Sequence, residues 1–345
     1  MSIEKVAKIA GVSAATVSRV LNDQHIVKPA TRDKVLAAIA QCNYQPNLLA
    51  RQLRTSRSRM LLVLVSNITN PFCSLVVRGI EEEAERHGYH ILLCNSESNP
   101  TRESAYLSLL RGKVVDGVIT MDAVSCLPGL TDMIGDFPWV QCGEGDPEFR
   151  ASSVTIDNLQ AASAGVYHLA AKNRQRIALI NSDMRYLYSQ QREQGYRKAL
   201  AELGFEYCKI EYVEELDYTA GAKAMEKLLQ NAPKPDAVFA ISDVIAGGAM
   251  SVLHQQGWHI PNDIAVLGFD GVPFGQVTTP PLSTIVQPMH QFGIRSVQLL
   301  LNKIKHPKLD DSHEILEWQL IERGSTLLTF LFPFWSCDIE IIRIR

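Results

Sequence analysis

The chain has 345 residues, 46% of them apolar, and a formal net charge of −3. This length allows two or three domains with sizeable cores, and no apolar run is long enough to span a membrane. The charge is unevenly divided, because residues 1–59 carry about +7 and the remainder about −10. The first segment is therefore expected to bind a polyanion, and the rest of the chain is not.

The cysteines and the first residues indicate the compartment. Seven cysteines form no CxxC pair and no metal-ligand spacing with histidine. We therefore expect reduced thiols, no metal and no cofactor. Lys5 and Lys8 interrupt any apolar run at the start of the chain, which is unlike a signal peptide. A cytoplasmic protein without a membrane partner is expected.

Two short helical patterns open the chain. Val6 and Ala10 lie at helical spacing, Gly11 interrupts, and the pattern resumes with Val17 and Leu21. A helix, a tight turn containing glycine and a second helix at a steep angle form a helix-turn-helix. The spacing therefore predicts this motif, with the glycine in a left-handed turn.

The second of these helices is expected to enter the major groove of DNA. Ser13 is placed to cap it. Small residues at its start permit close approach, Ala and Thr methyls can meet thymine methyls, and Arg19 can reach a guanine edge. The side chains predicted to contact DNA from this helix are Ser13, Ala14, Ala15, Thr16, Ser18, Arg19 and Asn22.

A third helix is predicted from Ala30 to Cys42, after Pro29, which suits the first helical position. Its apolar side chains Val35, Ala38 and Ile39 would close a three-helix core. Residues 1–45 are thus predicted to be an all-α DNA-binding domain, followed by a basic connector at 46–59. The alternative is a small helical bundle whose charged face is only solvated.

From Met60 onward short apolar runs alternate with amphipathic stretches. This alternation predicts parallel sheets covered by helices on both faces. Around 260 residues of the pattern exceed one ordinary domain, so two lobes are expected. Strands are predicted at 60–65, 90–94, 117–121, 139–142, 153–156, 177–180, 237–241 and 264–269, and helices at 74–87, 158–171, 191–203 and 220–230.

Several motifs together resemble the LacI/GalR family of bacterial transcription repressors. The resemblance begins with "IEKVAKIAGVSAATVSRVLN" and continues through "NPFCSLVVRGIEEEAERHGY", "VTIDNLQAA", "AVFAISDVIAGGAM", "IPNDIAVLGFDG", "PPLSTIVQP" and "LIERGST". It implies a hinge helix in the connector. There Leu53 would be an apolar wedge in the minor groove, with Ala50 and Arg54 also at the DNA.

The resemblance also implies that the body is a periplasmic-binding-protein-like domain of two Rossmann-like lobes with a ligand cleft between them. Lobe 1 would be about 60–158 and 291–317, and lobe 2 about 159–288 and 318–326. Asp270 directly follows a predicted strand, where open α/β sheets bind ligands. The full set of predicted effector-binding residues is Phe72, Tyr186, Arg192, Leu216, Tyr218, Ser242 and Asp270. Asp243 is instead predicted to cap the helix that begins near Val244.

Within the family, the motifs are most similar to members that respond to a nucleoside such as cytidine. A nucleoside would suit aromatic cleft walls and an aspartate for ribose hydroxyls. A sugar or a purine is the alternative. The expected partners are operator DNA, the small-molecule effector and a second copy of the chain, with two recognition helices on a palindrome. The resemblance also raises a second protein on neighbouring DNA, such as the cyclic-AMP receptor protein.

The sequence disfavours two other classes of protein. An enzyme is disfavoured because the sequence contains no phosphate loop, no nucleophile elbow and no HExxH. A small-molecule binding protein without a DNA role would not need the basic head. The last nineteen residues, 327–345, depart from the family and carry no functional prediction.

Overall fold

The computed structural model describes residues 2–22, 27–44, 57–121, 133–145 and 151–327, apart from the side chain of Asn22. The predictions for Ala50, Leu53 and Arg54, and the tail beyond Leu327, lie outside these residues. The chain divides into two compact units, residues 1–58 and 59–345.

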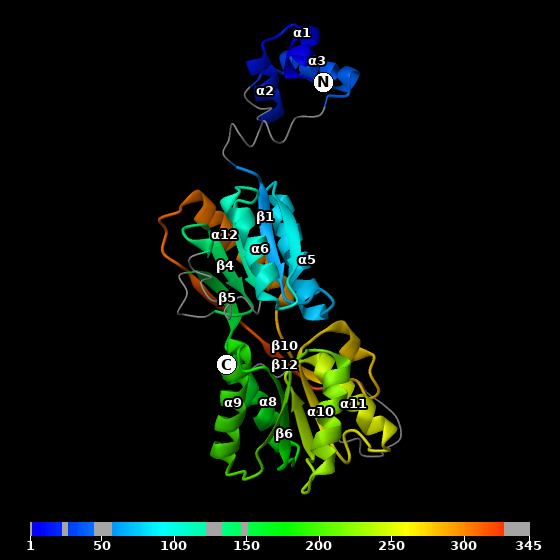
Figure 1. The fold of residues 1–345 in the computed structure, drawn as a ribbon. Helices are drawn as coiled ribbons and strands as arrows, with labels where there is room; N and C mark the ends of the chain where they lie inside the picture. Colours follow the sequence, from blue (N-terminus) through cyan, green and yellow to red (C-terminus); the bar gives the residue numbers. More distant parts are fainter. Residues whose placement is uncertain (1, 23–26, 45–56, 122–132, 146–150, 328–345) are drawn as a thin grey trace. The chain divides into compact units, whose positions relative to one another are not determined.

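The first unit contains the three helices that the sequence predicts (Figure 1). They are α1 (Ile3–Ala10), α2 (Ala14–Asn22) and α3 (Pro29–Cys42). Gly11 ends α1 in the left-handed conformation, with φ 66°. The Ser13 hydroxyl oxygen accepts the Thr16 N–H at 3.1 Å at the start of α2. The predicted turn and cap are both confirmed.

The core of this unit is formed by side chains from all three helices. Val6, Val17, Val20 and Val35 are fully buried. Ala10, Leu21 and Ile39, which the sequence places in the core, are partly buried and pack against its edge. The helix-turn-helix is therefore held by a small apolar core. Its charged side chains are left to the surface.

The second unit is built from two six-stranded sheets, one in each lobe (Figure 1). The sheet of lobe 1 has the order β11-β5-β4-β3-β1-β2 and is parallel throughout. Its strands are β1 (Met60–Val65), β2 (His90–Asn95), β3 (Gly117–Met121), β4 (Trp139–Cys142), β5 (Ser152–Ile156) and β11 (His313–Leu316). The helices of this lobe are α5 (Pro71–Arg86), α6 (Pro100–Arg111) and α12 (Met289–Lys305).

The sheet of lobe 2 repeats the same layout with the order β12-β10-β9-β8-β6-β7. Only β12 runs antiparallel to its neighbour. The strands are β6 (Ile177–Ser182), β7 (Lys209–Val213), β8 (Ala237–Ala240), β9 (Ala265–Asp270), β10 (Ser283–Val286) and β12 (Gln319–Ile321). The helices are α8 (Asn158–Ala171), α9 (Leu187–Leu203), α10 (Tyr218–Gln230) and α11 (Asp243–Gln255), with a 3-10 turn η3 (Pro273–Gln276).

Burial on both faces of each sheet explains the apolar strands. Successive side chains of a strand point to opposite faces. In β1, Leu61 and Val63 pack in one cluster with α5 and α12, whereas Leu62 and Leu64 pack in another with α6. Strands of this kind read as continuous apolar runs. All eight predicted strands and all four predicted helices are present.

The chain crosses between the lobes three times, after β5, between β10 and α12, and between β11 and β12. Each lobe is therefore completed by segments distant in sequence. Strands β7, β10, β11 and β12 were not predicted, and β7 and β11 are half-exposed, which blurs an apolar pattern. Across the described residues, no helix combines the length and the apolar character needed to cross a membrane.

Candidate functional site

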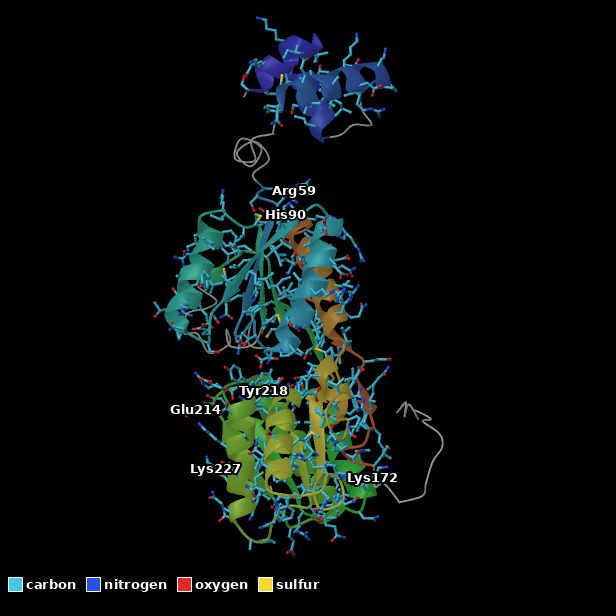
Figure 2. The ribbon with its side chains drawn as sticks, turned by 90° about the vertical axis from the view of Figure 1, so that its right-hand side faces the viewer. Arg59, His90, Lys172, Glu214, Tyr218 and Lys227 are labelled. Carbon is cyan, nitrogen blue, oxygen red and sulfur yellow. The ribbon has the colours of Figure 1, made fainter. Side chains whose placement is uncertain are left out.

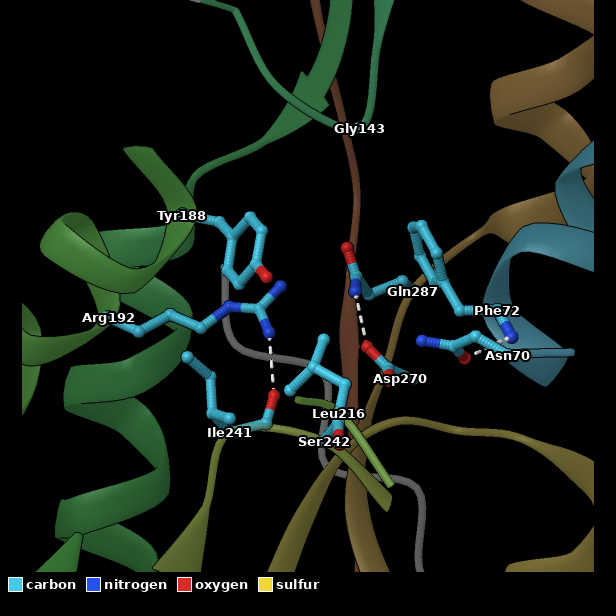
Figure 3. A pocket seen from close by; sticks show the side chains of 10 residues that line it. All are labelled: Asn70, Phe72, Gly143, Tyr188, Arg192, Leu216, Ile241, Ser242, Asp270 and Gln287. Carbon is cyan, nitrogen blue, oxygen red and sulfur yellow. Dashed lines mark hydrogen bonds between the residues drawn. The ribbon is translucent and has the colours of Figure 1, made fainter. Parts of the chain in front are cut away.

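A pocket lies between the two lobes, beyond the carboxyl ends of several parallel strands (Figure 3). Open α/β sheets bind ligands at this edge. Lobe 2 supplies most of the lining, lobe 1 supplies one wall, and a crossover between them supplies one amide. The lining residues are Asn70, Phe72, Gly143, Tyr188, Arg192, Leu216, Ile241, Ser242, Asp270 and Gln287.

Asp270 ends β9 with its carboxylate at the pocket. Its backbone has φ 107°, a conformation that residues other than glycine seldom adopt. Gln287, on the crossover after β10, donates its side-chain N–H to Asp270 Oδ1 at 2.8 Å. The Gln287 backbone N–H also donates to the Asp270 carbonyl oxygen at 3.0 Å. The carboxylate is thus held by the segment that links the lobes.

Asp243, behind the pocket, is completely buried. Its Oδ2 accepts the N–H groups of Gly271 and Val272, each at 2.8 Å, and its Oδ1 accepts the Thr284 hydroxyl at 2.6 Å. Burial raises the pKa of this carboxyl from 3.8 to about 7, although the hydrogen bonds and the nearby Arg323 act in the opposite direction.

The prediction that Asp243 caps its helix is wrong. The cap of α11 is Ser242, whose hydroxyl oxygen accepts the Ile245 N–H at 3.2 Å. Asp243 is the first residue of that helix, and its side chain turns toward the loop after β9. Ser and Asp are both common N-cap residues. Here Asp243 accepts hydrogen bonds from residues 271 and 272, so the cap is left to Ser242.

Arg192 of α9 supplies the positive charge of the pocket. One guanidinium N–H donates to Asn158 Oδ1 at 2.9 Å and another to the Ile241 carbonyl oxygen at 2.7 Å. The guanidinium carbon also lies 3.5 Å from the centre of the Phe269 ring, a cation–π contact. These contacts fix the orientation of the side chain in the site.

Lobe 1 contributes an aromatic wall from the start of α5. Asn70 caps this helix, since its Oδ1 accepts the Phe72 N–H at 3.0 Å. The Phe72 ring packs edge-on against Phe292 of α12, with 6.3 Å between ring centroids. Figure 3 shows Phe72 and Asn70 facing Tyr188 and Arg192 across the pocket, with Asp270 between them. The pocket thus combines aromatic surface with one carboxylate, one guanidinium and two amide side chains.

Five of the seven predicted effector residues line the pocket, namely Phe72, Arg192, Leu216, Ser242 and Asp270. The two predicted tyrosines are not among the lining residues. The Tyr186 ring stacks on Tyr188 at 5.3 Å, and its hydroxyl lies 3.1 Å from the Ser98 hydroxyl of lobe 1. Tyr218 is 51% exposed and packs against Phe274. Figure 2 labels it at the start of α10, with Lys227 further along that helix.

The sequence reasoning missed five lining residues. One of them had a usable signal, because Tyr188 lies four residues before Arg192 and so shares its face of the helix. Gln287 had none, since only the crossover of the folded chain brings it to Asp270. The missed set is Asn70, Gly143, Tyr188, Ile241 and Gln287.

Of the residues predicted to contact DNA, Ser13 precedes α2, and Ala14 at its first position packs against the core instead of pointing outward. Ala15 and Arg19 are exposed, whereas Val17 and Val20 point into the core. This division gives α2 an outward face that is small near its first turn and basic one turn later. Within the part of the chain that the structure describes, no group of three His, Cys, Asp or Glu side chains could hold a metal ion.

Comparisons with known proteins identify the class. Residues 2–47 match the model of bacterial regulatory proteins of the lacI family, and residues 166–326 match a periplasmic binding protein-like domain. The chain is 35% identical over 330 residues to the HTH-type transcriptional repressor CytR of Escherichia coli K12, covering 94% of this chain and 96% of CytR. It is 34% identical over 328 residues to the ribose operon repressor of the same strain, covering 94% and 99%.

The solved structures agree with this result. The lac repressor dimer bound to operator and the anti-inducer ONPF matches with a TM-score of 0.85 and 26% identity, over 95% of this chain and 99% of that one. The chain belongs to the LacI family of bacterial regulatory proteins. It is a DNA-binding transcriptional repressor with a periplasmic-binding-protein-like body, and its relatives are repressors rather than enzymes.

Proposed function

We propose that this protein is a homodimeric repressor of a palindromic operator, and that a nucleoside such as cytidine, bound between its lobes, regulates its affinity for DNA. The observation that supports a nucleoside is the composition of the pocket. It combines two charged side chains, Asp270 and Arg192, with two facing aromatic rings, Phe72 and Tyr188. An aspartate can accept two ribose hydroxyls, and the rings suit a planar base. The resemblance to nucleoside-responsive members of the family supports the same ligand.

A sugar is the second candidate. Asp270, Gln287 and Asn70 together offer carboxylate and amide groups for a ring of hydroxyls. A relative of similar identity is named as the ribose operon repressor. A purine would use the aromatic walls but leave the carboxylate without hydroxyl donors. Free ribose would use the carboxylate but leave the rings uncovered. A nucleoside satisfies both parts of the lining.

The regulation follows from the position of the pocket. A ligand that contacts both lobes favours one angle between them, and the angle sets the separation of the two segments that lead to the DNA-binding heads of the dimer. Coupling of this kind is typically about 1–3 kcal/mol and must be reciprocal, so that DNA changes ligand affinity by the same factor. The sign of the coupling expected from the resemblance is relief of repression by the ligand.

The homodimer would place two copies of α2 on two half-sites. Exposed apolar side chains on the body offer surfaces for the second copy: Leu93 and Val114 on lobe 1, and Tyr218 and Val277 on lobe 2. We also propose that the protein acts in the cytoplasm. There the cyclic-AMP receptor protein, bound to neighbouring DNA, would be an additional partner.

The ligand is tested by thermal unfolding of the full chain with cytidine, adenosine, adenine and ribose. We expect cytidine to raise the melting temperature the most, because a ligand that binds only the folded state stabilises it. A rise with ribose alone would assign the pocket to a sugar. A rise with adenine alone would assign it to a purine.

The DNA role is tested by mobility shift on a palindromic operator, with random DNA as competitor and with cytidine or the cyclic-AMP receptor protein added. Arg19→Ala should relax discrimination at one base pair per half-site, by about 1–3 kcal/mol. The control is Lys8→Ala, an exposed charge on α1. An even loss across all operator variants would make Arg19 a phosphate contact.

A further inference from the structure

The backbone at Asp270 must be held in place by its surroundings. Its φ of 107° lies in a region that glycine tolerates and other residues avoid. A free chain would leave this conformation, and the carboxylate would then turn away from the pocket. Some group must therefore restrain the peptide that follows Asp270.

Asp243 restrains that peptide directly. One of its carboxylate oxygens accepts two consecutive backbone N–H groups, those of Gly271 and Val272, at 2.8 Å each. Its other oxygen is anchored by the Thr284 hydroxyl of the neighbouring strand β10 at 2.6 Å. The two residues after Asp270 are thereby fixed to the start of α11.

Space for this arrangement is built into the surrounding backbone. A Cβ atom at Gly268 would lie 2.2 Å from Asp243 Oδ1, so a side chain there would displace the carboxylate. A Cβ at Gly271 would lie 2.7 Å from a methyl group of Val286, and the φ of Gly271 is 79°. One glycine on each side of Asp270 thus makes room: Gly268 for the Asp243 carboxylate and Gly271 for strand β10.

We propose that Asp243 is a positioning residue for effector recognition: by holding the N–H groups of residues 271 and 272, it aims the Asp270 carboxylate into the pocket between the lobes. This proposal rests on the proposed function only in taking Asp270 as a ligand contact. Asp243 itself does not line the pocket. It acts through the backbone, and Gln287 completes the restraint from the other side.

The same sheet offers a matched control at its other end. Asp236, before β8, also accepts two consecutive backbone N–H groups, those of Gln175 at 3.3 Å and Arg176 at 2.9 Å. It lies at the amino ends of β6 and β8, whereas the pocket lies at the carboxyl ends. Loss of Asp236 should therefore loosen lobe 2 without moving Asp270.

The experiment compares the full-length protein with Asp243→Ala, Asp243→Asn and Asp236→Ala. Cytidine binding is measured by calorimetry, and the melting temperature of each variant is measured without ligand. Asp243→Ser replaces Asp243→Ala if the latter does not fold. We expect Asp243→Ala to weaken cytidine binding by about tenfold or more, because the Asp270 carboxylate would no longer point at the ligand and its hydrogen bonds to the ligand would be lost. Asp243→Asn should stay within about threefold, because its amide oxygen can still accept both N–H groups.

Several outcomes would overturn the proposal. One is an equal fall in melting temperature for Asp243→Ala and Asp236→Ala with cytidine affinity retained by both, which would leave Asp243 a purely structural residue. Another is loss of binding in Asp243→Asn with an unchanged melting temperature, which would assign the effect to charge rather than position. Asp236→Ala must keep its affinity for the positioning role to stand.

Failure of the proposed effector is distinguished by the unmodified protein. If cytidine gives no heat with it, the nucleoside proposal fails, and the crystal structure of Asp243→Ala decides the positioning role alone. We expect Asp270 to leave its positive φ and to lose the 2.8 Å bond from Gln287 in that variant. Retention of both features would overturn the proposal.

Discussion

The two lobes share one sheet layout but contribute different chemistry to the pocket. Lobe 1 supplies Asn70, Phe72 and Gly143, which carry no charge. Lobe 2 supplies both charged groups, Arg192 and Asp270. The charged side chains of the pocket thus come from lobe 2, whereas each lobe contributes one aromatic ring, Phe72 from lobe 1 and Tyr188 from lobe 2. Two lobes of the same topology contribute different groups because the residues after each strand differ while the strands do not.

Among the residues that the structure describes, each lobe buries one carboxyl group whose pKa is raised by burial, Glu103 in lobe 1 and Asp243 in lobe 2. Asp243 has partners on both of its oxygens. Glu103 has one oxygen for which no hydrogen-bond partner is found among the described residues. The lobe 2 carboxyl thus holds the loop that follows Asp270, whereas neither carboxyl lines the pocket itself.

The largest effect that we expect concerns stability against pH. The folded-state pKa of Asp243, about 7, lies above its usual value of 3.8. Its contribution to stability is thus fully present below about pH 4 and is lost as the pH rises to about 7, at roughly 1.4 kcal/mol per pH unit. The side chain in Asp243→Asn does not titrate, so the free energy of unfolding of this variant relative to the native protein should increase over that range. Urea unfolding from pH 4 to pH 8 measures the difference.

Glu103→Gln is the lobe 1 counterpart of this measurement. Burial raises the pKa of Glu103, so the sign of the change is the same. The stability of Glu103→Gln relative to the native protein should therefore also increase as the pH rises above the ordinary pKa of a glutamate. Parallel stability curves for the Asp243→Asn variant and the native protein would contradict the raised pKa and remove the contrast between the lobes.

The next effect concerns the polar anchor in lobe 2. Asp270→Asn keeps the size of the side chain but removes its charge. A hydrogen bond to a charged group contributes about 1.5–3 kcal/mol, so cytidine affinity should fall by roughly one to two orders of magnitude. Operator binding without ligand should be retained. Calorimetry and mobility shift together would measure both. Unchanged cytidine affinity would remove Asp270 from the site.

A smaller effect is expected from the aromatic cover in lobe 1. Phe72→Leu keeps an apolar side chain and most of the packing against Phe292. It removes the flat ring, which contributes about 0.5–1.5 kcal/mol to a stacked contact. Cytidine affinity should therefore fall by about two- to tenfold, while any affinity for free ribose should not change. An equal loss for both ligands would show that the ring does not cover a base.

The smallest effect concerns the hydrogen bond that joins the lobes beside the pocket, between the hydroxyls of Ser98 and Tyr186 at 3.1 Å. Ser98→Ala and Tyr186→Phe should each weaken cytidine binding only slightly, by the low end of the range for one hydrogen bond, about 0.5 kcal/mol. The double variant should lose no more than either single one, because both remove the same bond.

This cycle also decides the role of Tyr186. If Tyr186→Phe causes a further loss in the Ser98→Ala background, the tyrosine hydroxyl contacts the ligand itself, as the sequence predicted. Additive losses would also mean that another contact joins the lobes. If the double variant loses no more than either single variant, the Tyr186 hydroxyl acts by joining the lobes.

By itself, the sequence determined the architecture of this protein. The apolar strands from β1 to β9, apart from β7, and the helix-turn-helix around Gly11 follow from local patterning, since burial on both faces and a left-handed turn each leave a mark on adjacent residues. Asp270 was predictable for a related reason, because it directly follows a buried parallel strand.

Only the tertiary structure decided which side chains meet at the pocket. Tyr188 enters the pocket lining whereas Tyr186 does not, because Tyr186 precedes α9 in extended backbone, stacks on the Tyr188 ring and places its hydroxyl beside that of Ser98. Gln287 reaches Asp270 because β10 pairs with β9 across a gap in sequence. Asp243 turns from capping a helix to holding residues 271 and 272 because two backbone N–H groups brought there by the fold need an acceptor.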